Sequence, residues 1–269
     1  MTSRLDLVFA RLKERNEAAL VTFITAGDPA GDGTPALVAA LGHAGADIVE
    51  LGIPYSDPLA DGPSIQASSQ RALERGVTPA SVLDMVRAAR GQSDVPLVLM
   101  TSYNLVLRYG LARFAEDAAE AGADGAILTD LPPEEAGAWK TQADANHLAT
   151  VFLVTPVSTE ARLQLIAAHA TGFVYCVSRT GVTGGRKELP PELVKYLGRV
   201  RAATAKPLCV GFGISTPEQV AQVAGIADGV VIGATLVDFL HGAADNPKQA
   251  QELATLVGDW KRATRRDGP

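Results

Sequence analysis

Short apolar segments recur along the whole chain, separated by segments with the period of an amphipathic helix. Several of the apolar segments, such as 151–154 and 230–232, have no polar residue at alternating positions. Continuously apolar strands are typical of a parallel sheet that is covered on both faces. The predicted strands begin near Leu20, Ile48, Leu97, Ala126, Thr150, Phe173, Leu208 and Val230.

The intervening segments complete a pattern in which a strand and a helix alternate eight times. Leu111, Phe114, Ala115 and Ala118, for example, fall on one face of a helix. Eight such units in about 250 residues favour an α/β fold of the (β/α)8 TIM barrel type over an open doubly wound sheet. No linker or break in composition divides the chain, so residues 1–269 are predicted to form one domain with an extra N-terminal helix.

Helix boundaries are indicated by residue chemistry as well as by period. A threonine followed by proline suits a helix start, because the hydroxyl can cap backbone N–H groups and the proline ring fits the first turn. Glycine suits a helix end, because it adopts the left-handed conformation readily. These signals predict starts at Thr34, Thr78 and Thr216 and ends at Gly45, Gly122 and Gly172.

Composition and charge narrow the class of protein. With 47% apolar residues among 269, the chain can form a large core without a metal or a disulfide. Cys176 and Cys209 fall in apolar runs, which indicates reduced core thiols in a cytoplasmic protein. A net charge of -6, from 24 basic and 30 acidic residues, disfavours binding to nucleic acid or to an anionic membrane. No apolar run approaches the roughly 18 residues of a membrane span.

Two connections are overlong, at 53–63 and 178–190, and both follow the carboxyl ends of predicted strands, where a TIM barrel builds its active site. Glu50 lies in the strand before the first of these loops. An ionised carboxylate facing the helix layer would be costly, so we expect Glu50 to face the barrel interior. Apolar surroundings would raise its pKa and suit it to proton transfer. The alternative is a structural glutamate paired with an arginine or a backbone amide.

Three aspartates near the same end of the barrel allow two interpretations each. Asp57 and Asp61 lie in the first long loop, and Asp130 follows the fourth predicted strand. Each could take part in chemistry or could only cap a turn, because aspartate is frequent at turn positions. The residues by themselves leave both interpretations open.

Glycines follow the last two predicted strands, at Gly211 and Gly213 and at Gly233, and each group leads into a helix. Backbone N–H groups at helix N-termini bind phosphate, and the loops after strands seven and eight are a recurring phosphate site in TIM barrels. The pattern therefore predicts a phosphorylated ligand. Gly184 and Gly185 of the second long loop could add further N–H groups.

The positions of lysine and histidine limit the chemistry. No lysine falls at the upper end of a predicted strand, so a Schiff-base mechanism lacks its nucleophile. The four histidines fall in or beside predicted helices without ligand spacing, so we expect no metal site. What remains is acid–base chemistry by carboxylates on a small phosphorylated substrate.

Three motifs carry a family resemblance: ELGIPYSDPLADGP at 50–63, SRTGVTG at 178–184 and GFGIS at 211–215. Together, in this order, they resemble the tryptophan synthase α subunit family. The resemblance implies a lyase that cleaves indole-3-glycerol phosphate to indole and glyceraldehyde 3-phosphate, with no cofactor in this chain. It also implies an αββα complex, in which indole passes through a tunnel to a β subunit that carries pyridoxal phosphate.

The resemblance also implies roles for individual residues. Glu50 is expected to transfer protons, and Asp61 is expected to hydrogen-bond the indole N–H. Pro54 and Asp57 are expected to face the β subunit. The residues implied in substrate binding, through the indole pocket, the second long loop or the phosphate, are Phe23, Tyr175, Thr183, Gly184, Phe212, Gly213, Gly233 and Ala234.

Two positions depart from the family pattern. Ala234 stands where a hydroxyl residue is common, so a side-chain donor to phosphate is missing. Ser102 stands where an aromatic ring is expected beside the indole. The alternative functions are a free-standing indole-glycerol-phosphate lyase, a phosphosugar isomerase or epimerase on the same barrel, and a regulatory partner that retains only the fold.

Overall fold

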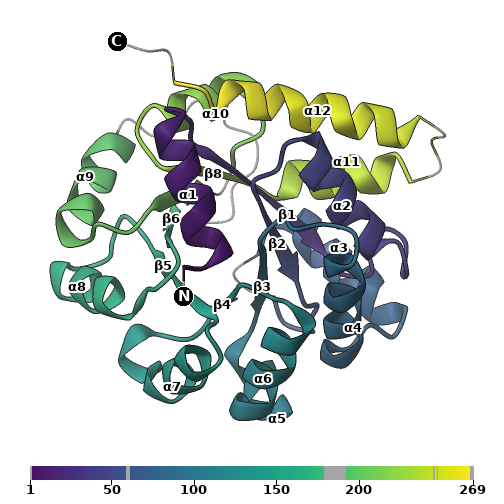
Figure 1. Cartoon of the computed structure of the whole chain (residues 1–269), viewed down its shortest axis with the longest axis horizontal. Coiled ribbons are helices and arrows are strands. Elements are labelled where there is room, and N and C mark those ends of the chain that lie inside the picture. Colours follow the sequence, from purple (N-terminus) through teal and green to yellow (C-terminus); the bar gives the residue numbers. More distant parts are fainter. Residues whose placement is uncertain are drawn as a thin grey trace.

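A computed structural model describes residues 2–58, 61–178, 192–211, 213–244, 246 and 248–266. Its eight parallel strands pair in sequence order and close into a barrel, which confirms the predicted TIM barrel (Figure 1). Each strand begins within one residue of the position predicted from the sequence. The strands are β1 Ala19–Thr25, β2 Ile48–Gly52, β3 Leu97–Thr101, β4 Gly125–Leu128, β5 Ala149–Val154, β6 Val174–Val177, β7 Leu208–Gly211 and β8 Gly229–Ile232.

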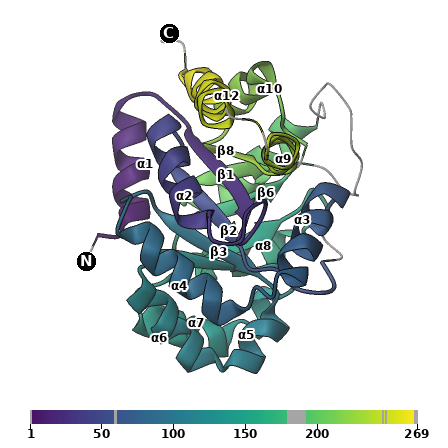
Figure 2. The ribbon, with the colours of Figure 1, turned by 90° about the vertical axis from the view of Figure 1, so that its right-hand side faces the viewer.

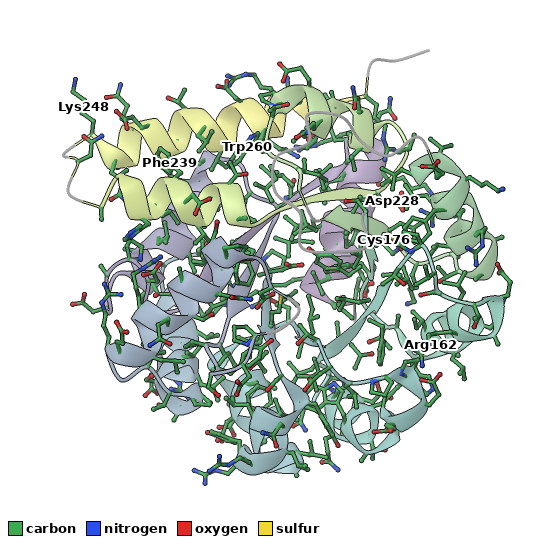
Figure 3. All side chains as sticks on the ribbon, turned by 180° about the vertical axis from the view of Figure 1, so that it is seen from behind. Arg162, Cys176, Asp228, Phe239, Lys248 and Trp260 are labelled. Atoms are coloured by element: carbon green, nitrogen blue, oxygen red, sulfur yellow. The ribbon has the colours of Figure 1, made fainter. Side chains whose placement is uncertain are left out.

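Helices form a ring around the barrel, and Figure 3 shows this ring from behind, with Arg162 and Lys248 at its rim. The helices are α1 Arg4–Glu14, α2 Thr34–Ala44, α3 Pro63–Glu74, α4 Pro79–Arg90, α5 Tyr103–Tyr109, α6 Leu111–Ala121, α7 Gly137–Ala145, α8 Glu160–His169, α9 Leu193–Ala203, α10 Pro217–Ala224, α11 Ala234–Gly242 and α12 Gln249–Ala263, with a 3₁₀ turn η1 Pro133–Glu135. Among the residues that the structure describes, no helix has the length and apolarity needed to cross a membrane.

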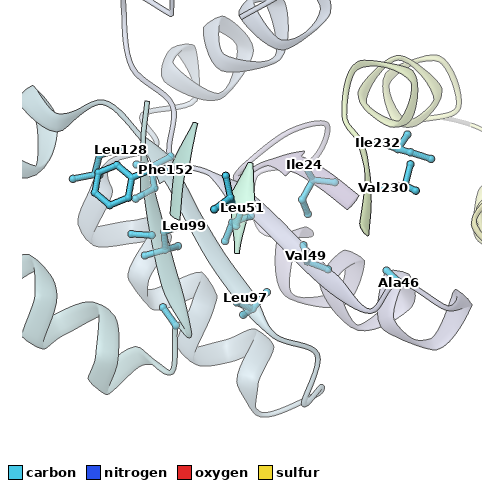
Figure 4. Close-up of a cluster of buried hydrophobic side chains, with 14 of the residues drawn as sticks. Ile24, Ala46, Val49, Leu51, Leu97, Leu99, Leu128, Phe152, Val230 and Ile232 are labelled. Carbon is cyan, nitrogen blue, oxygen red and sulfur yellow. The ribbon is translucent and has the colours of Figure 1, made fainter. Parts of the chain in front are cut away.

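The side chains of each strand alternate between two buried clusters. The outer cluster fills the space between sheet and helices and includes Val49 and Leu51 of β2 (Figure 4). The inner cluster fills the barrel and includes Ile48 of the same strand. Because successive side chains of a strand point to opposite faces, Glu50 and Gly52 share the inward face with Ile48.

Glycines inside the barrel make room for two aromatic rings. A Cβ atom at Gly52 would lie 2.7 Å from Cζ of Phe23, so the Phe23 ring crosses β2 directly over this glycine. Gly211 leaves space in the same way for the Tyr175 phenol. Small residues on β2 and β7 therefore let two large rings occupy the upper barrel.

Helix α1 closes the N-terminal end of the barrel. Its buried residues Leu5, Val8 and Leu12 belong to the inner cluster, and a capping box between Ser3 and Asp6 fixes its start. Figure 2 shows α1 on one side of the barrel and α3, which follows β2, on the opposite side. The predicted N-terminal helix is thus confirmed, and it leaves the other end of the barrel for the site.

Aspartates brace the N-terminal end. The residue directly before β2, β4 and β8 is an aspartate, and its carboxylate accepts a hydrogen bond from a backbone N–H near the start of the preceding strand. The three pairs are Asp47 with Leu20 at 2.9 Å, Asp124 with Leu97 at 2.8 Å and Asp228 with Leu208 at 2.9 Å. Each carboxylate also meets a cation: Lys261 for Asp47, Arg90 for Asp124 and Arg201 for Asp228.

All three predicted helix starts are confirmed within one residue, and two of the three threonines cap their helices. Thr78 and Thr216 cap their helices through capping boxes. Helix α2 also begins at Thr34 as predicted, but the expected cap by the Thr34 hydroxyl is wrong, because this hydroxyl instead accepts a hydrogen bond of 2.9 Å from the N–H of Gly27. The Thr34 side chain therefore braces the turn after β1.

The predicted helix ends also hold at two of three positions. Gly45 and Gly122 are left-handed C-caps, with φ of 116° and 98°. The prediction for Gly172 is wrong, because α8 ends at His169 and is followed by an extended residue, Ala170. The backbone thus leaves the helix before it reaches the glycine.

The two cysteines lie in the core as expected. Both are free, buried thiols. Cys209 belongs to the inner cluster and Cys176, labelled in Figure 3, to the outer cluster. Burial raises the pKa of Cys176 to about 12, so this thiol stays protonated and unreactive.

Candidate active site

Glu50 faces the upper interior of the barrel with no partner. Its side chain is fully buried, and neither carboxylate oxygen has a hydrogen-bond partner in the described part of the chain. Burial in these apolar surroundings raises the pKa of Glu50 to about 8, so the group holds its proton at neutral pH. The expected inward orientation is therefore present, and the pairing that a structural glutamate would need is absent from the described residues.

Asp61 is the second acid at this end of the barrel. It lies just before α3 and is 6% exposed. Burial raises the pKa of Asp61 to about 6. No described residue forms an ion pair or a hydrogen bond with the Asp61 carboxyl that would oppose this shift. Helix α3 begins after Gly62 without a side-chain cap, so the Asp61 carboxylate is not a helix cap.

Tyr175 of β6 lies near both acids. Burial first, and then the charges of Glu50 and Asp61, raise the pKa of this phenol well above its usual range. Three residues that the sequence separates by 125 positions thus share one environment at the upper end of the barrel.

A small pocket opens next to Asp61, and we call it the inner pocket. Its free space is about 10 Å³, room for roughly one water molecule. Glu50 does not line it, whereas Phe23, which is the partner of Glu50 in the strand register, and Gly52, two residues after Glu50, do. The residues that line the inner pocket are Phe23, Gly52, Ile53, Tyr55, Asp61, Ile65, Ser69, Met100 and Thr129.

Helix α3, which carries the Asp61 end of the loop, is fastened to the turn region after β1. The hydroxyls of Thr25 and Ser68 are hydrogen-bonded at 2.6 Å. The guanidinium of Arg71 donates two hydrogen bonds of 2.7 Å each to the buried carboxylate of Asp28. Such bidentate contacts fix orientation as well as distance, so they hold α3 against β1.

The loop that carries Asp61 is also held from α3. The side-chain amide of Gln66 donates a hydrogen bond of 2.9 Å to the carbonyl of Asp61. The Asp61 N–H donates to the carbonyl of Pro58 at 3.0 Å. The backbone of Asp61 is therefore positioned from both directions, while its carboxylate has no partner among the residues that the structure describes.

Two of the glycines predicted to bind phosphate, Gly213 and Gly233, follow β7 and β8 in the described part of the chain. Gly213, after β7, has φ of 84°, a conformation that favours glycine. Gly233 precedes α11, whose first residue is Ala234, and a Cβ at Gly233 would lie 3.6 Å from Cβ of Phe23. Trp260 of α12 is buried and donates a hydrogen bond of 3.1 Å to the carbonyl of Ser215, which ties α12 to the loop after β7.

Three residues of the expected site lie outside the described part of the chain: Thr183, Gly184 and Phe212. The remaining expected residues lie in the described part of the chain, and four of them, Phe23, Asp61, Pro54 and Asp57, line a cavity. No group of three or more histidine, cysteine, aspartate or glutamate side chains that could hold a metal occurs among the described residues.

Comparison with known proteins decides the family. A family model described as tryptophan synthase alpha chain matches residues 9–265. The tryptophan synthase alpha chain of Geobacter sulfurreducens is 51% identical over 261 residues, which cover 97% of this chain and 98% of that protein. The solved tryptophan synthase subunit alpha of Legionella pneumophila has a TM-score of 0.91 and 38% identity, over 98% of this chain and 99% of that one.

The chain belongs to the tryptophan synthase alpha chain family. It is accordingly a lyase of the indole-3-glycerol phosphate cleavage step of tryptophan biosynthesis. The alpha chain family carries no cofactor, and pyridoxal phosphate belongs to the beta chain. The fold also matches a chain of solved Mycobacterium tuberculosis tryptophan synthase, with a TM-score of 0.90 and 38% identity, over 99% of this chain and 100% of that one.

The alpha chain fold also presents a larger groove outside the inner pocket, and we call it the outer groove. Its volume is about 750 Å³. Both residues expected to face the β subunit, Pro54 and Asp57, line it. The full lining is Pro54, Tyr55, Ser56, Asp57, Leu73, Val77, Thr78, Pro79, Ser102, Asn104, Leu105, Arg108, Tyr109, Thr129 and Asp130.

The structure explains two positions that sequence reasoning left open. Ser102 caps α5, since its hydroxyl accepts a hydrogen bond from the N–H of Leu105 at 3.4 Å, and its side chain faces the outer groove. Asp130 accepts a hydrogen bond of 2.5 Å from the N–H of Tyr103, so its carboxylate joins the ends of β3 and β4. Asp130 therefore has a structural contact that reaches beyond its own turn.

Sequence reasoning missed most residues of the inner pocket. Met100, Ile65, Ser69, Tyr55 and Thr129 line it without having been assigned a role. Met100 could have been found, because it shares the inward face of β3 with Val98. Tyr55 and Thr129 lie in loops, where no period indicates the direction of a side chain.

Proposed function

We propose that Glu50 carries out the proton transfers of indole-3-glycerol phosphate cleavage and that Asp61 stabilises the positive charge that develops on the indole ring. The observation that carries this proposal is the unpaired, fully buried Glu50 carboxyl at the barrel mouth. A pKa raised to about 8 leaves the group protonated at neutral pH, as a general acid must be.

The chemistry uses this proton first. Protonation of C3 of the indole places positive charge on the ring nitrogen, and the bond from C3 to the glycerol carbon can then donate its electrons to the ring. As this bond breaks, the hydroxyl on the departing carbon loses its proton and becomes an aldehyde. The Glu50 carboxylate left by the first step accepts that proton, so Glu50 ends the cycle in its starting form.

Asp61 contributes a negative charge, opposite in sign to the positive charge that develops on the indole ring. With a pKa of about 6, it is largely ionised at neutral pH and accepts a hydrogen bond from the indole N–H as positive charge forms there. A positioned acid–base group typically contributes about 10²–10⁴ in rate, and a charge stabiliser contributes a similar factor. The two carboxyls thus divide the work because their environments set different pKa values.

The same end of the barrel would also bind the indole ring and the phosphate of the substrate. Phe23 and Tyr175, with Phe212, would contact the indole ring, and Thr183 would belong to the loop that closes over Asp61. The phosphate would rest on backbone N–H groups of Gly184, Gly213, Gly233 and Ala234. The N-terminus of α11 supports this placement, because its N–H groups and dipole favour an anion. Ala234 keeps its N–H and lacks only a hydroxyl donor.

Catalysis also requires a rearrangement in the barrel. Phe23 and Gly52, but not Glu50, line the inner pocket, and the pocket as it stands is smaller than any indole ring. We infer that substrate displaces the Phe23 ring, which brings C3 within reach of the Glu50 carboxyl. Enclosure of the reacting groups in this way excludes water and strengthens their interactions.

We further propose that the outer groove docks a pyridoxal-phosphate β subunit in an αββα complex in the cytoplasm, with Pro54 and Asp57 at the contact. The likeness to a chain of solved M. tuberculosis tryptophan synthase supports the partner. The groove supports the location, because it adjoins the inner pocket and exposes apolar side chains such as Leu105.

The direct test is to incubate the purified chain with indole-3-glycerol phosphate and to assay indole with and without a β subunit. We expect slow indole release alone and faster release with the partner. High turnover without a partner would favour a free-standing lyase. Activation of the β subunit without any indole release would leave only a regulatory role, and would contradict the roles given to Glu50 and Asp61.

A further inference from the structure

The inner pocket and the outer groove share two lining residues, Tyr55 and Thr129. Every other described residue that lines one of these cavities does not line the other. The side chains of Tyr55 and Thr129 therefore form the partition between the space beside Asp61 and the surface outside it.

The partition lies across three neighbouring strand ends. At the ends of β2, β3 and β4, one residue faces the inner pocket and a residue one or two positions later faces the groove. These pairs are Ile53 and Pro54 after β2, Met100 and Ser102 at β3, and Thr129 and Asp130 after β4. Tyr55 spans the same gap, since it follows β2 and reaches the residue that follows β4.

One hydrogen bond joins the two halves of the partition. The hydroxyl oxygens of Tyr55 and Thr129 are 3.4 Å apart. The Thr129 hydroxyl donates its only proton to the carbonyl of Thr101, also at 3.4 Å, so Tyr55 must be the donor in the contact with Thr129. Both bonds are at the long limit for O–H···O contacts, so this latch is weak.

The surroundings of the Tyr55 phenol keep it a donor. Burial is the largest cause that raises its pKa, and the charges of Asp61 and Asp130 raise it further. Asp61 lines the inner pocket and Asp130 lines the groove, so the phenol lies between one carboxylate on each side. Tyr55 is only half-buried, and its exposed part belongs to the lining of the groove.

The groove beyond the partition suits one of the two products better than the other. Leu73, Val77 and Leu105 give it an apolar wall near Tyr55. A neutral aromatic ring gains from contact with such a wall, whereas a phosphorylated aldehyde would lose its hydration there. Passage across the partition would therefore separate indole from glyceraldehyde 3-phosphate.

We propose that the Tyr55 side chain is a door, latched by Thr129, through which indole leaves the inner pocket for the outer groove. This proposal rests on the function proposed above, and it adds the residues that control one step of it. When Tyr55 swings away from Thr129, the two cavities become continuous. When it returns, the reacting groups are closed off again from the groove.

The test uses the chain in complex with a β subunit, supplied with serine, and indole-3-glycerol phosphate as the probe. Cleavage is followed by glyceraldehyde 3-phosphate, and arrival of indole by tryptophan formation in the same single turnover. Thr129→Leu fills the partition, and we expect the lag between the two signals to lengthen tenfold or more, which corresponds to ~1.4 kcal/mol of added barrier. Thr141→Leu on the exposed face of α7 makes the same chemical change away from both cavities and should leave the lag unchanged.

Tyr55→Phe removes only the latching hydroxyl and keeps the ring. Loss of one weak hydrogen bond should shorten the lag by about two- to tenfold without changing the distance from Glu50 to the substrate. This variant also covers the case in which Thr129→Leu does not fold. A lag that is the same in Tyr55→Phe and in the unaltered chain would overturn the door.

The outcomes separate the two proposals. If the chain in the complex releases no glyceraldehyde 3-phosphate, the proposed function is contradicted, and the proposed role of Tyr55, which depends on that function, is contradicted as well. A chain that cleaves the substrate normally but shows the same lag in Thr129→Leu, Tyr55→Phe and Thr141→Leu contradicts the door alone.

Discussion

Carboxylates lie at both ends of this barrel, and the two ends treat them differently. At the N-terminal end, Asp47, Asp124 and Asp228 each accept a backbone N–H and pair with a lysine or an arginine. At the C-terminal end, the carboxyl groups of Glu50 and Asp61 are buried without an ion pair or hydrogen bond to a described residue. The first arrangement stabilises the fold, and the second leaves reactive groups available.

The pKa values express the same contrast. Burial raises the pKa of Asp47, but the charge and hydrogen bond of Lys261, the Leu20 N–H and the charge of Arg11 all lower it. For Glu50, burial acts without opposition. A buried carboxyl without partners keeps its proton, and a carboxyl that must deliver a proton at neutral pH needs that property.

The largest expected effect is on catalysis. Glu50→Gln keeps the shape of the side chain and removes the transferable proton, so cleavage of indole-3-glycerol phosphate should fall by about 10²–10⁴. Asp47→Asn makes the matching change at the other end and should keep activity within a few-fold. Steady-state indole release, measured on variants shown to be folded by circular dichroism, checks both. A similar loss of indole release in the two variants would contradict the assignment of a catalytic carboxyl to the C-terminal end alone.

A large effect on stability should appear at the N-terminal end. Asp124→Ala leaves the half-buried Arg90 and the N–H of Leu97 without their partner, and it should lower the free energy of unfolding by about 3–5 kcal/mol. Asp84→Ala removes an exposed carboxylate paired with Arg87 and should cost less than about 1 kcal/mol. Urea unfolding of both variants gives the comparison. An equal loss of unfolding free energy in the two variants would mean that the buried contacts of Asp124 stabilise the fold no more than an exposed ion pair does.

Glu50→Gln should also stabilise the protein, in a way that depends on pH. The folded state keeps the Glu50 proton up to about pH 8, whereas an unfolded glutamate loses it near 4.5. Stability of the unaltered chain therefore falls as pH rises between these values, and the glutamine variant escapes that fall. We expect a difference near zero at the acidic limit and roughly 3.5 kcal/mol at pH 7, about 2.5 units above the pKa of an unfolded glutamate, because one pKa unit is worth about 1.4 kcal/mol. A difference that does not grow with pH would contradict the shift.

The smallest effect is on the shape of the pH–rate profile. With Asp61 ionised above about pH 6 and Glu50 protonated below about pH 8, kcat/KM should be bell-shaped between these limits. On the acidic side the rate should fall about tenfold per pH unit as Asp61 takes up a proton. Asp61→Asn should be slower throughout and should lose the acidic limb only. An acidic limb that persists in this variant would assign it to another group.

The sequence predicts the barrel well because strand and helix periods are local signals. Glu50 is placed correctly for a further local reason, since its neighbours in the strand are apolar on alternating faces. The cap expected from the Thr34 hydroxyl and the helix end expected at Gly172 are wrong, because contacts made elsewhere, such as the Gly27 N–H for Thr34, decide what these residues do.

The partition between Tyr55 and Thr129 shows the limit of the same reasoning. Seventy-four positions separate these residues, and neither lies in a segment with a period. Their contact exists only because β2 and β4 end on either side of β3 in the closed sheet. Asp130 and Tyr103 meet for the same reason, through a backbone N–H that no side-chain pattern reveals.

The central claim is that the Glu50 carboxyl at the barrel mouth is neutral at physiological pH. Infrared difference spectroscopy of the chain across a pH titration measures this directly, with Glu50→Gln to identify the band. The account predicts a protonated carboxyl band that disappears around pH 8 and is missing from the variant. A Glu50 band that is already lost near pH 4.5, the ordinary value for glutamate, would contradict it.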